Sequence, residues 1–250
     1  MNKRDYDALA GIWWAGVDAV RGAEAVSAGL TQDEPIEPDL VAAIGKAAAS
    51  MCVGALRHLG DQARLLVITA PGYAGDDLAG NADIEFIASS HPLPDARSIH
   101  AGQRLLDRVT SLGSDASLLL LVSGGASALA ELPEDGVTLD QLRTSNQEWI
   151  SGGLSIDEIN SRRRKLSRIK GGRLLQQFAG AKVRVYAISD VKGDDIAVIG
   201  SGVGDPALAT CDAKATIVAS NRHARQAAAA YAANNGYVVQ LNEESLYGDV

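Results

Sequence analysis

The chain has 250 residues, of which 46% are hydrophobic and 22% charged, and its formal net charge is −8. This composition is typical of a soluble globular protein. The acidic balance argues against a general binder of nucleic acid or of anionic membranes, because neither partner attracts a negative surface. The two cysteines, Cys52 and Cys211, lie far apart and outside any CxxC pattern, which indicates a reducing cytoplasm and argues against a zinc site.

The first segment of the chain has a helical pattern of apolar residues. Aspartates interrupt the run, so it differs from a signal peptide, and no segment reaches the roughly 20 apolar residues of a membrane span. We therefore expect an amphipathic helical arm over residues 1–30. The apolar residues that recur at helical spacing are Leu9, Ile12, Trp13, Val17 and Val20.

Strands and helices are expected to alternate over residues 38–250. The predicted strands are short apolar runs without polar alternation, as expected when both faces of a sheet are buried. This order predicts a single α/β domain with a doubly wound, mostly parallel sheet, in which ligands bind beyond the carboxyl ends of the strands. The strands are predicted at 40–44, 64–69, 84–88, 117–122, 183–188, 215–219 and 237–241. The helices are predicted at 46–58, 95–112, 139–150, 156–168, 172–179 and 221–234.

Two of the predicted strand ends carry glycine-containing loops suited to anions. Gly45 and Lys46 open a helix, whose N-terminus and added charge would suit a phosphate, although a solvated lysine explains this pattern more simply. After strand 117–122 comes the segment SGGAS, residues 123–127, whose glycines allow backbone N–H groups to converge. An ordinary tight turn with a capping serine explains that segment equally well. Neither loop matches a Walker A, GxSxG or GxGxxG motif.

Two further strand ends carry titratable side chains. Asp190, Asp194 and Asp195 follow strand 183–188, where a carboxylate could hold Mg²⁺ or accept a proton, but aspartates are also common in turns. His91 follows strand 84–88 within a proline-rich turn, so we favour a structural role over a role as base or phosphate ligand. Asp95 is expected to cap the next helix.

The stretch INSRRRKLSRIKGGR, residues 159–173, contains seven basic residues in an acidic chain. Ser155 and Glu158 form a capping-box pattern at the start of its helix. Helical periodicity places Asn160, Arg163 and Ser167 on or beside the apolar arc of Ile156, Ile159 and Leu166, and it turns Arg162, Arg164, Lys165 and Arg168 toward solvent. An inward arginine needs a carboxylate partner or an anionic ligand, and Lys170 adds a cation at the following glycine turn.

Five segments resemble, in order and spacing, the type 2 glycerate kinase family: GKAA, HPLPD, SGGASAL, IDEINSRRRKLSRIKGGRL and SDVKGDD. The resemblance implies a Rossmann-like N-terminal domain and a C-terminal MOFRL domain with a cleft between them. It further implies phosphorylation of D-glycerate to 2-phosphoglycerate with ATP and Mg²⁺. It covers nearly all of this chain but only the N-terminal part of a full-length member, so we expect the second domain to be absent here.

The resemblance also implies roles for individual residues. Lys46 would contact the transferred phosphate, and Asp190 would serve as base or, with Asp194, as metal ligand. Ala126 departs from the family pattern, because it replaces a usual third glycine and would be strained if that position has a positive φ. The residues expected to bind substrate or phosphate are Ser123, Gly124, Gly125, Ser127, Asn160, Arg163, Ser167 and Lys170.

Two alternatives to a complete kinase remain open from the sequence. One is a catalytically impaired module that binds a small hydroxy acid or a nucleotide, and the other is half of a split kinase that a separate MOFRL-like domain or chain completes. Hydroxypyruvate reduction is disfavoured, because the chain lacks a dinucleotide fingerprint. The expected partners are therefore D-glycerate or a related hydroxy acid and a nucleotide, in the cytoplasm, without nucleic acid or membrane; homo-oligomerisation stays open.

Overall fold

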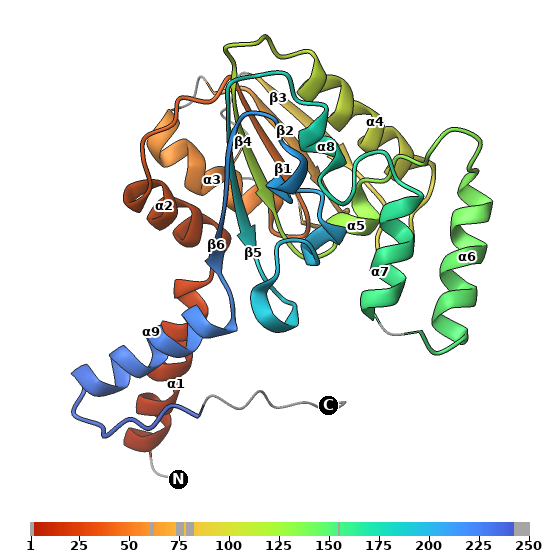
Figure 1. The fold of residues 1–250 in the computed structure, drawn as a ribbon. Helices are drawn as coiled ribbons and strands as arrows, with labels where there is room; N and C mark the ends of the chain where they lie inside the picture. Colours follow the sequence, from red (N-terminus) through yellow and green to blue (C-terminus); the bar gives the residue numbers. More distant parts are fainter. Residues whose placement is uncertain (1–2, 61–62, 74–77, 79–82, 155, 243–250) are drawn as a thin grey trace.

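The computed structural model describes residues 3–60, 63–73, 78, 83–154 and 156–242 (Figure 1). Within these residues, six strands form one sheet in the order β3-β2-β1-β4-β5-β6, and every neighbouring pair is parallel. This sheet confirms the predicted α/β class and places the reversal of strand order between β1 and β4. The strands are β1 (Leu40–Ile44), β2 (Leu65–Thr69), β3 (Ile84–Ala88), β4 (Ser117–Val122), β5 (Lys182–Ile188) and β6 (Asp212–Ala219).

The central strands are apolar along their whole length because helices cover both faces of the sheet. Successive side chains of a strand point to opposite faces. Leu40 and Ile44 of β1 accordingly belong to one buried cluster, whereas Val41 and Ala43 belong to a second cluster on the other face. All five residues of β1 are buried, which explains the absence of polar alternation in its sequence.

The helices divide between these two faces. α2 (Gly22–Gln32) and α3 (Ala48–Leu59) cover one face, and α4 (Ala96–Thr110), α5 (Ala126–Leu129) and α8 (Arg173–Gln176) cover the other. α6 (Leu139–Ser151) and α7 (Ile156–Lys165) lie side by side as a helical hairpin next to the sheet (Figure 1). None of the described helices combines the length and the apolar character needed to cross a bilayer.

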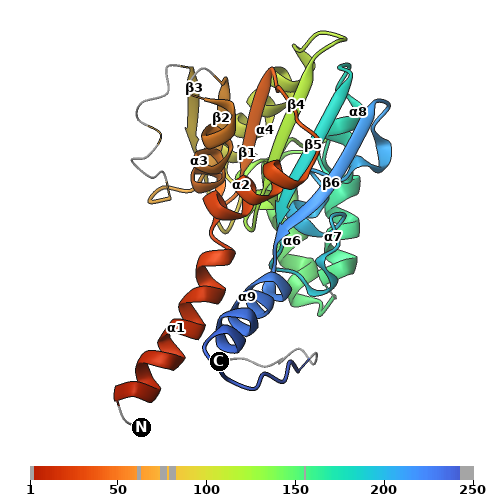
Figure 2. The same cartoon turned by 90° about the vertical axis from the view of Figure 1, so that its left-hand side faces the viewer.

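The first helix packs differently from the amphipathic arm expected from its sequence. α1 (Lys3–Ala19) extends away from the sheet and packs against α9 (Asn221–Asn234), as Figure 2 shows. The contact uses glycines: a Cβ at Gly16 would come within 2.9 Å of the Ala224 carbonyl oxygen. Of the apolar residues at helical spacing, Leu9 and Trp13 are 56% and 68% exposed.

Two further expectations from the sequence are corrected. The predicted strand at 237–241 does not form, and its residues are exposed with no strand paired to them. The apolar run resembles a buried strand, but after α9 ends at Asn234 the chain turns at Gly236, which has a φ of +84°, and runs away from the edge strand β6. The predicted helix 156–168 ends at Lys165, and Ser155 of its capping box lies outside the described residues.

Candidate functional site

The loops after β1 and β4 touch at the point where the strand order reverses. The Lys46 amide donates to the Gly124 carbonyl at 2.9 Å, and the Ala47 amide donates to Ser123 Oγ at 3.1 Å. Gly45 has a φ of +132°, and a Cβ there would overlap the Ser123 hydroxyl, so only glycine allows the two loops this approach. The amides of residues 46 and 47 are therefore already hydrogen-bonded within the protein and are not available to a phosphate.

The glycine-rich loop accommodates its alanine without backbone strain. Gly125 has a φ of +90° and caps α5, whereas Ala126 is the first residue of that helix and does not have a positive φ. Ala126 is also buried, with 2% of its surface exposed. Alanine therefore fits at the position where the family usually has a third glycine. The backbone strain that a positive φ would cause does not arise.

Side chains from three other loops flank this glycine-rich loop. A Cβ at Gly125 would lie 3.0 Å from His91 Cδ2 and 3.3 Å from Lys46 Cε. On the other side, the carboxylate of Asp190 lies against Gly124, where a Cβ would stand 3.2 Å from its Cγ. The ends of β1, β3, β4 and β5 thus meet at one place, as the rule for parallel sheets predicts.

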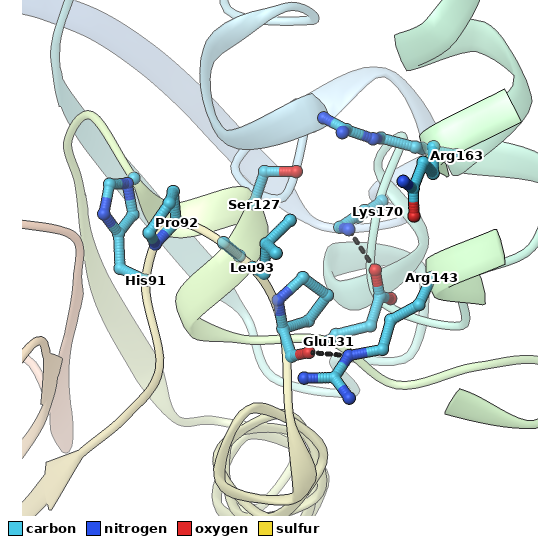
Figure 3. Close-up of a pocket in the computed structure, with 12 residues that line it drawn as sticks. His91, Pro92, Leu93, Ser127, Glu131, Arg143, Arg163 and Lys170 are labelled. Atoms are coloured by element: carbon cyan, nitrogen blue, oxygen red, sulfur yellow. Dashed lines mark hydrogen bonds and ion pairs between the residues drawn. The ribbon is translucent and has the colours of Figure 1, made fainter. Parts of the chain in front are cut away.

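A cavity of about 570 Å³ opens beside the glycine-rich loop (Figure 3). Loop 91–94, α5 and the α6–α7 hairpin line it, together with Lys170. This volume lies within the range of small-molecule sites. Four of the residues predicted to bind substrate line the cavity, namely Gly125, Ser127, Arg163 and Lys170.

A buried ion pair lies beside this cavity. Lys170 Nζ donates to Glu131 Oε2, and both residues are at most 4% exposed. The second carboxylate oxygen, Oε1, accepts the Leu132 amide at 3.0 Å. Burial lowers the pKa of Lys170, and the nearby Glu131 opposes that shift; the pKa of Arg163 is lowered for the same reason and opposed by the same carboxylate. Glu131 therefore lies within electrostatic reach of two cations at once.

The inward polar residues of α7 and its extension have different surroundings. Asn160 Oδ1 accepts from Ser201 Oγ at 3.3 Å, and Ser201 Oγ is 2.8 Å from Ser127 Oγ, so a hydrogen-bonded chain links α7 to the glycine-rich loop. Ser167 lies beyond the end of the helix, is fully buried, and does not line the cavity; its carbonyl accepts from Arg173 at 2.8 Å. Of Asn160, Arg163 and Ser167, which were predicted to face inward, Arg163 alone lines the cavity.

Arg164, a basic residue predicted to face solvent, is partly buried. Arg164 donates through Nη1 to the Ala197 carbonyl at 3.2 Å, and its aliphatic carbons cover Gly171. The segment after β5 packs against this side of α7, which the periodicity of one helix could not reveal. Arg162 does face outward, with its guanidinium 5.9 Å from the centre of the Trp149 ring.

The two aspartates predicted as metal ligands differ in position. Asp190 is exposed beside Gly124, and a single carboxylate there fits Mg²⁺, which commonly binds through one or two carboxylates together with substrate phosphates. Asp194 lies in the turn η2 (Lys192–Asp194) with a φ of 54° and does not line the cavity. Across the described parts of the chain, no group of three or more His, Cys, Asp or Glu residues is arranged to hold a metal ion.

Several residues that line the cavity were not predicted from sequence patterns. Glu131 and Arg143 were not among the candidates, and a structural role was favoured for His91. Burial and the nearby Lys46 lower the pKa of His91, which favours its neutral form at pH 7. Glu131 and Arg143 belong to no motif, and only the tertiary arrangement brings them to the site.

A family model matches residues 8–233, and its description is a domain of unknown function, DUF4147. The chain belongs to this family. It is similar to the D-glycerate 2-kinase of Thermotoga maritima, with 37% identity over 69% of this chain and 41% of that protein. It is also 37% identical to the glycerate 2-kinase of Pyrococcus horikoshii, over 66% of this chain and 37% of that protein. The chain thus spans less than half the length of these relatives.

Solved structures agree with this relationship. The glycerate kinase crystal structure from Thermotoga maritima superposes with a TM-score of 0.84 at 26% identity, covering 94% of this chain and 64% of that one. A Pyrococcus horikoshii protein shares the fold, with a TM-score of 0.80 at 24% identity. The resemblance to glycerate 2-kinases expected from the five sequence segments is therefore confirmed.

Proposed function

We propose that this DUF4147 chain acts in ATP-dependent phosphorylation of D-glycerate to 2-phosphoglycerate, as the N-terminal half of a glycerate 2-kinase. The observation that carries the proposal is the cationic cavity beside the glycine-rich loop, in a chain whose relatives include glycerate 2-kinases. Phosphoryl transfer depends mainly on positioning two reactants and on stabilising developing negative charge. Loops from four strand ends supply fixed donors and cations for these two tasks.

Each predicted residue has a place in this proposal. Arg163 and Lys170 set the positive potential of the cavity, and Gly125 with Ser127 forms its wall beside the substrate. Lys46 stabilises the transferred phosphoryl group from the far side of Gly125. Asp190 accepts the proton of the substrate hydroxyl or, in the alternative role, would hold Mg²⁺ together with the nucleotide phosphates. Asn160, Ser123, Gly124 and Ser167 hold these loops in position.

Mg²⁺, when bound, would neutralise charge on the nucleotide phosphates. The remaining partners follow from this reaction. ATP is the nucleotide, a separate or linked MOFRL-like domain closes the cleft, and the reaction takes place in the cytoplasm, where ATP is available. Homo-oligomerisation is compatible with this proposal and is not required by it.

The test combines binding and turnover. Calorimetry with D-glycerate should show binding that Arg163→Ala abolishes, whereas Arg162→Ala, which removes the same charge outside the cavity, should leave it unchanged. ADP release should be measured with and without an added C-terminal domain from the Thermotoga maritima relative. Absence of turnover in both settings, together with no binding of D-glycerate or ATP, would refute the kinase.

The alternative of an impaired binding module has lost one of its two supports. It was motivated in part by the alanine at position 126, and that residue has an unstrained helical backbone. Binding of D-glycerate and ATP without turnover, even when the second domain is supplied, is the outcome that would favour the module over the kinase.

A further inference from the structure

Arg143 has an arrangement that the proposed reaction does not yet use. It lies on α6 at the cavity, and its Nε donates to the Pro94 carbonyl at 3.0 Å (Figure 3). Among the described residues, its two terminal nitrogens have no hydrogen bond or ion pair. The guanidinium is thus anchored at one nitrogen while the other two keep their donors for a ligand. A planar guanidinium with two parallel donors matches a carboxylate.

The charges around the cavity point to the arginines as the anion-binding groups. Lys170 is already paired with Glu131, so its charge is largely balanced. His91 favours its neutral form, because burial and Lys46 lower its pKa. The other cations that line the cavity are Arg143 and Arg163, on the two helices of the α6–α7 hairpin, and Arg143 is the one whose terminal nitrogens have no partner among the described residues.

We infer that Arg143 is a specificity-determining residue that binds the carboxylate of the substrate through its two terminal nitrogens. This inference rests on the proposed function, and it makes Arg143 the residue that selects D-glycerate over an uncharged polyol such as glycerol. Gln147 lies one helical turn after Arg143 and lines the same cavity, so its amide is placed to donate to the same ligand.

The anchoring of Nε suggests why an arginine serves here better than a lysine. The hydrogen bond to Pro94 ties α6 to loop 91–94 and fixes the plane of the guanidinium before the ligand arrives. A lysine has no second nitrogen with which to keep this tie while it binds an anion. We therefore expect Arg143→Lys to recover only part of the binding that Arg143→Ala loses.

The experiment measures binding by calorimetry to the 250-residue chain with D-glycerate, glycerol and ADP as probes. Arg143→Ala should weaken D-glycerate binding by roughly ten- to hundredfold, the loss expected for a charge-assisted hydrogen-bonded pair. The affinity of Arg143→Lys for D-glycerate should lie between those of the wild type and Arg143→Ala. Arg162→Ala, on the same hairpin, should bind D-glycerate like the wild type. Glycerol should not bind measurably to any of them, and the affinity for ADP should not change.

The outcomes separate this inference from the proposed function. If Arg163→Ala loses D-glycerate while Arg143→Ala binds it like the wild type, the inference is wrong and the kinase proposal stands. An equal loss of ADP binding in Arg143→Ala would indicate a structural role and also overturn the inference. A wild type that binds neither D-glycerate nor nucleotide would overturn both.

Discussion

Cavities lie at both ends of the sheet, and they differ in chemistry more than in size. The cavity at the carboxyl ends measures about 570 Å³ and is lined by two arginines and a lysine. The hollow at the amino ends measures about 700 Å³ and is lined by prolines, two acidic residues and His58. Volume alone would select the second. An anionic substrate can be bound only where cations face the cavity, so chemistry selects the first.

The charged residues of the two ends are used in different ways. Toward the amino ends, cations pair with surrounding carboxylates: Arg184 Nη2 is 2.9 Å from Asp212 Oδ2, and Lys214 Nζ is 2.6 Å from Asp33 Oδ1. At the carboxyl ends, Arg143 has no carboxylate partner among the described residues and lines a cavity. Both ends therefore contain paired charges, but only at the carboxyl end is a described arginine that lines a cavity left available to meet a ligand.

The largest effect should come from the ion pair beside the carboxyl-end cavity. Glu131→Gln leaves the buried Lys170 without its carboxylate, and breaking a buried pair typically costs about 3–5 kcal/mol. Urea denaturation followed by far-UV circular dichroism measures this loss. The control is Arg57→Gln toward the amino end, where the pair with Glu24 is about half exposed and should contribute less than about 1 kcal/mol. Similar losses in the free energy of unfolding of Glu131→Gln and Arg57→Gln would contradict the expected difference between the buried and the exposed ion pair.

The contact between the two glycine loops should give the next largest effect. Gly45→Ala forces a methyl group onto Ser123, 2.6 Å from its carbonyl oxygen, in addition to the cost of a positive φ. We expect a loss of about 2–4 kcal/mol in the free energy of unfolding, from overpacking and backbone strain together. Gly60→Ala, at the amino side, has a φ of +72° with open space around it, so it should show the backbone strain alone. Equal losses in the free energy of unfolding of Gly45→Ala and Gly60→Ala would show that the contact between the two loops adds no steric cost.

Helix α4 allows a comparison of the two ends within one element. Asp95 caps its N-terminus as predicted, accepting the Arg97 amide at 2.8 Å, and Asp95→Ala should cost about 1 kcal/mol. Ser111→Ala at the other terminus should change stability by less than about 0.5 kcal/mol. Thermal melts of both variants test this difference.

The cap at Asp95 should also depend on pH. The hydrogen bond from Arg97 lowers the pKa of Asp95 from 3.8 to about 2. The folded state therefore binds this proton less readily than the unfolded state, so the stabilisation is full above the unfolded value and is lost as the pH falls toward 2. The difference between the wild type and Asp95→Ala should shrink over that range; a difference that stays constant would contradict the charge-assisted cap.

The smallest expected effect is a change in the pKa of His91. Lys46 and burial lower the pKa of His91, so Lys46→Met should raise it by removing the nearby positive charge. Nuclear magnetic resonance can follow this directly, because the chain has only four histidines. The signal of His58, at the amino end, serves as the internal control. An unchanged His91 titration would mean that Lys46 does not share its site.

The fold was predictable because its determinants are local. Residues 40–44 and 117–122 are continuous apolar runs, and the structure buries them between helices as expected. The same signal failed at 237–241, because an apolar run forms a strand only where the preceding chain brings it alongside a sheet edge, and here the chain leads away from β6. The helix cap at Asp95 was predicted correctly because it also depends on residues that are close in the sequence.

The site was only partly predictable because its contacts are not local. Arg163 was found from helical periodicity, but Arg164 was misplaced, since its surroundings depend on a segment more than thirty residues away. The sequence could not show whether position 125 or 126 takes the positive φ. Glu131 and Arg143 carry no periodic or motif signal, and their importance follows only from what they face.

The placement of the tryptophans has a consequence for optical measurements. The chain has three: Trp13 and Trp14 on α1, both more than half exposed, and Trp149 on α6 beside Arg162. None lies in the sheet, so intrinsic fluorescence does not report on the core directly. With Trp13→Phe and Trp14→Phe in place, the remaining emission comes from the hairpin that carries Arg143 and Arg163. That variant would give a spectroscopic signal of events at the cavity wall.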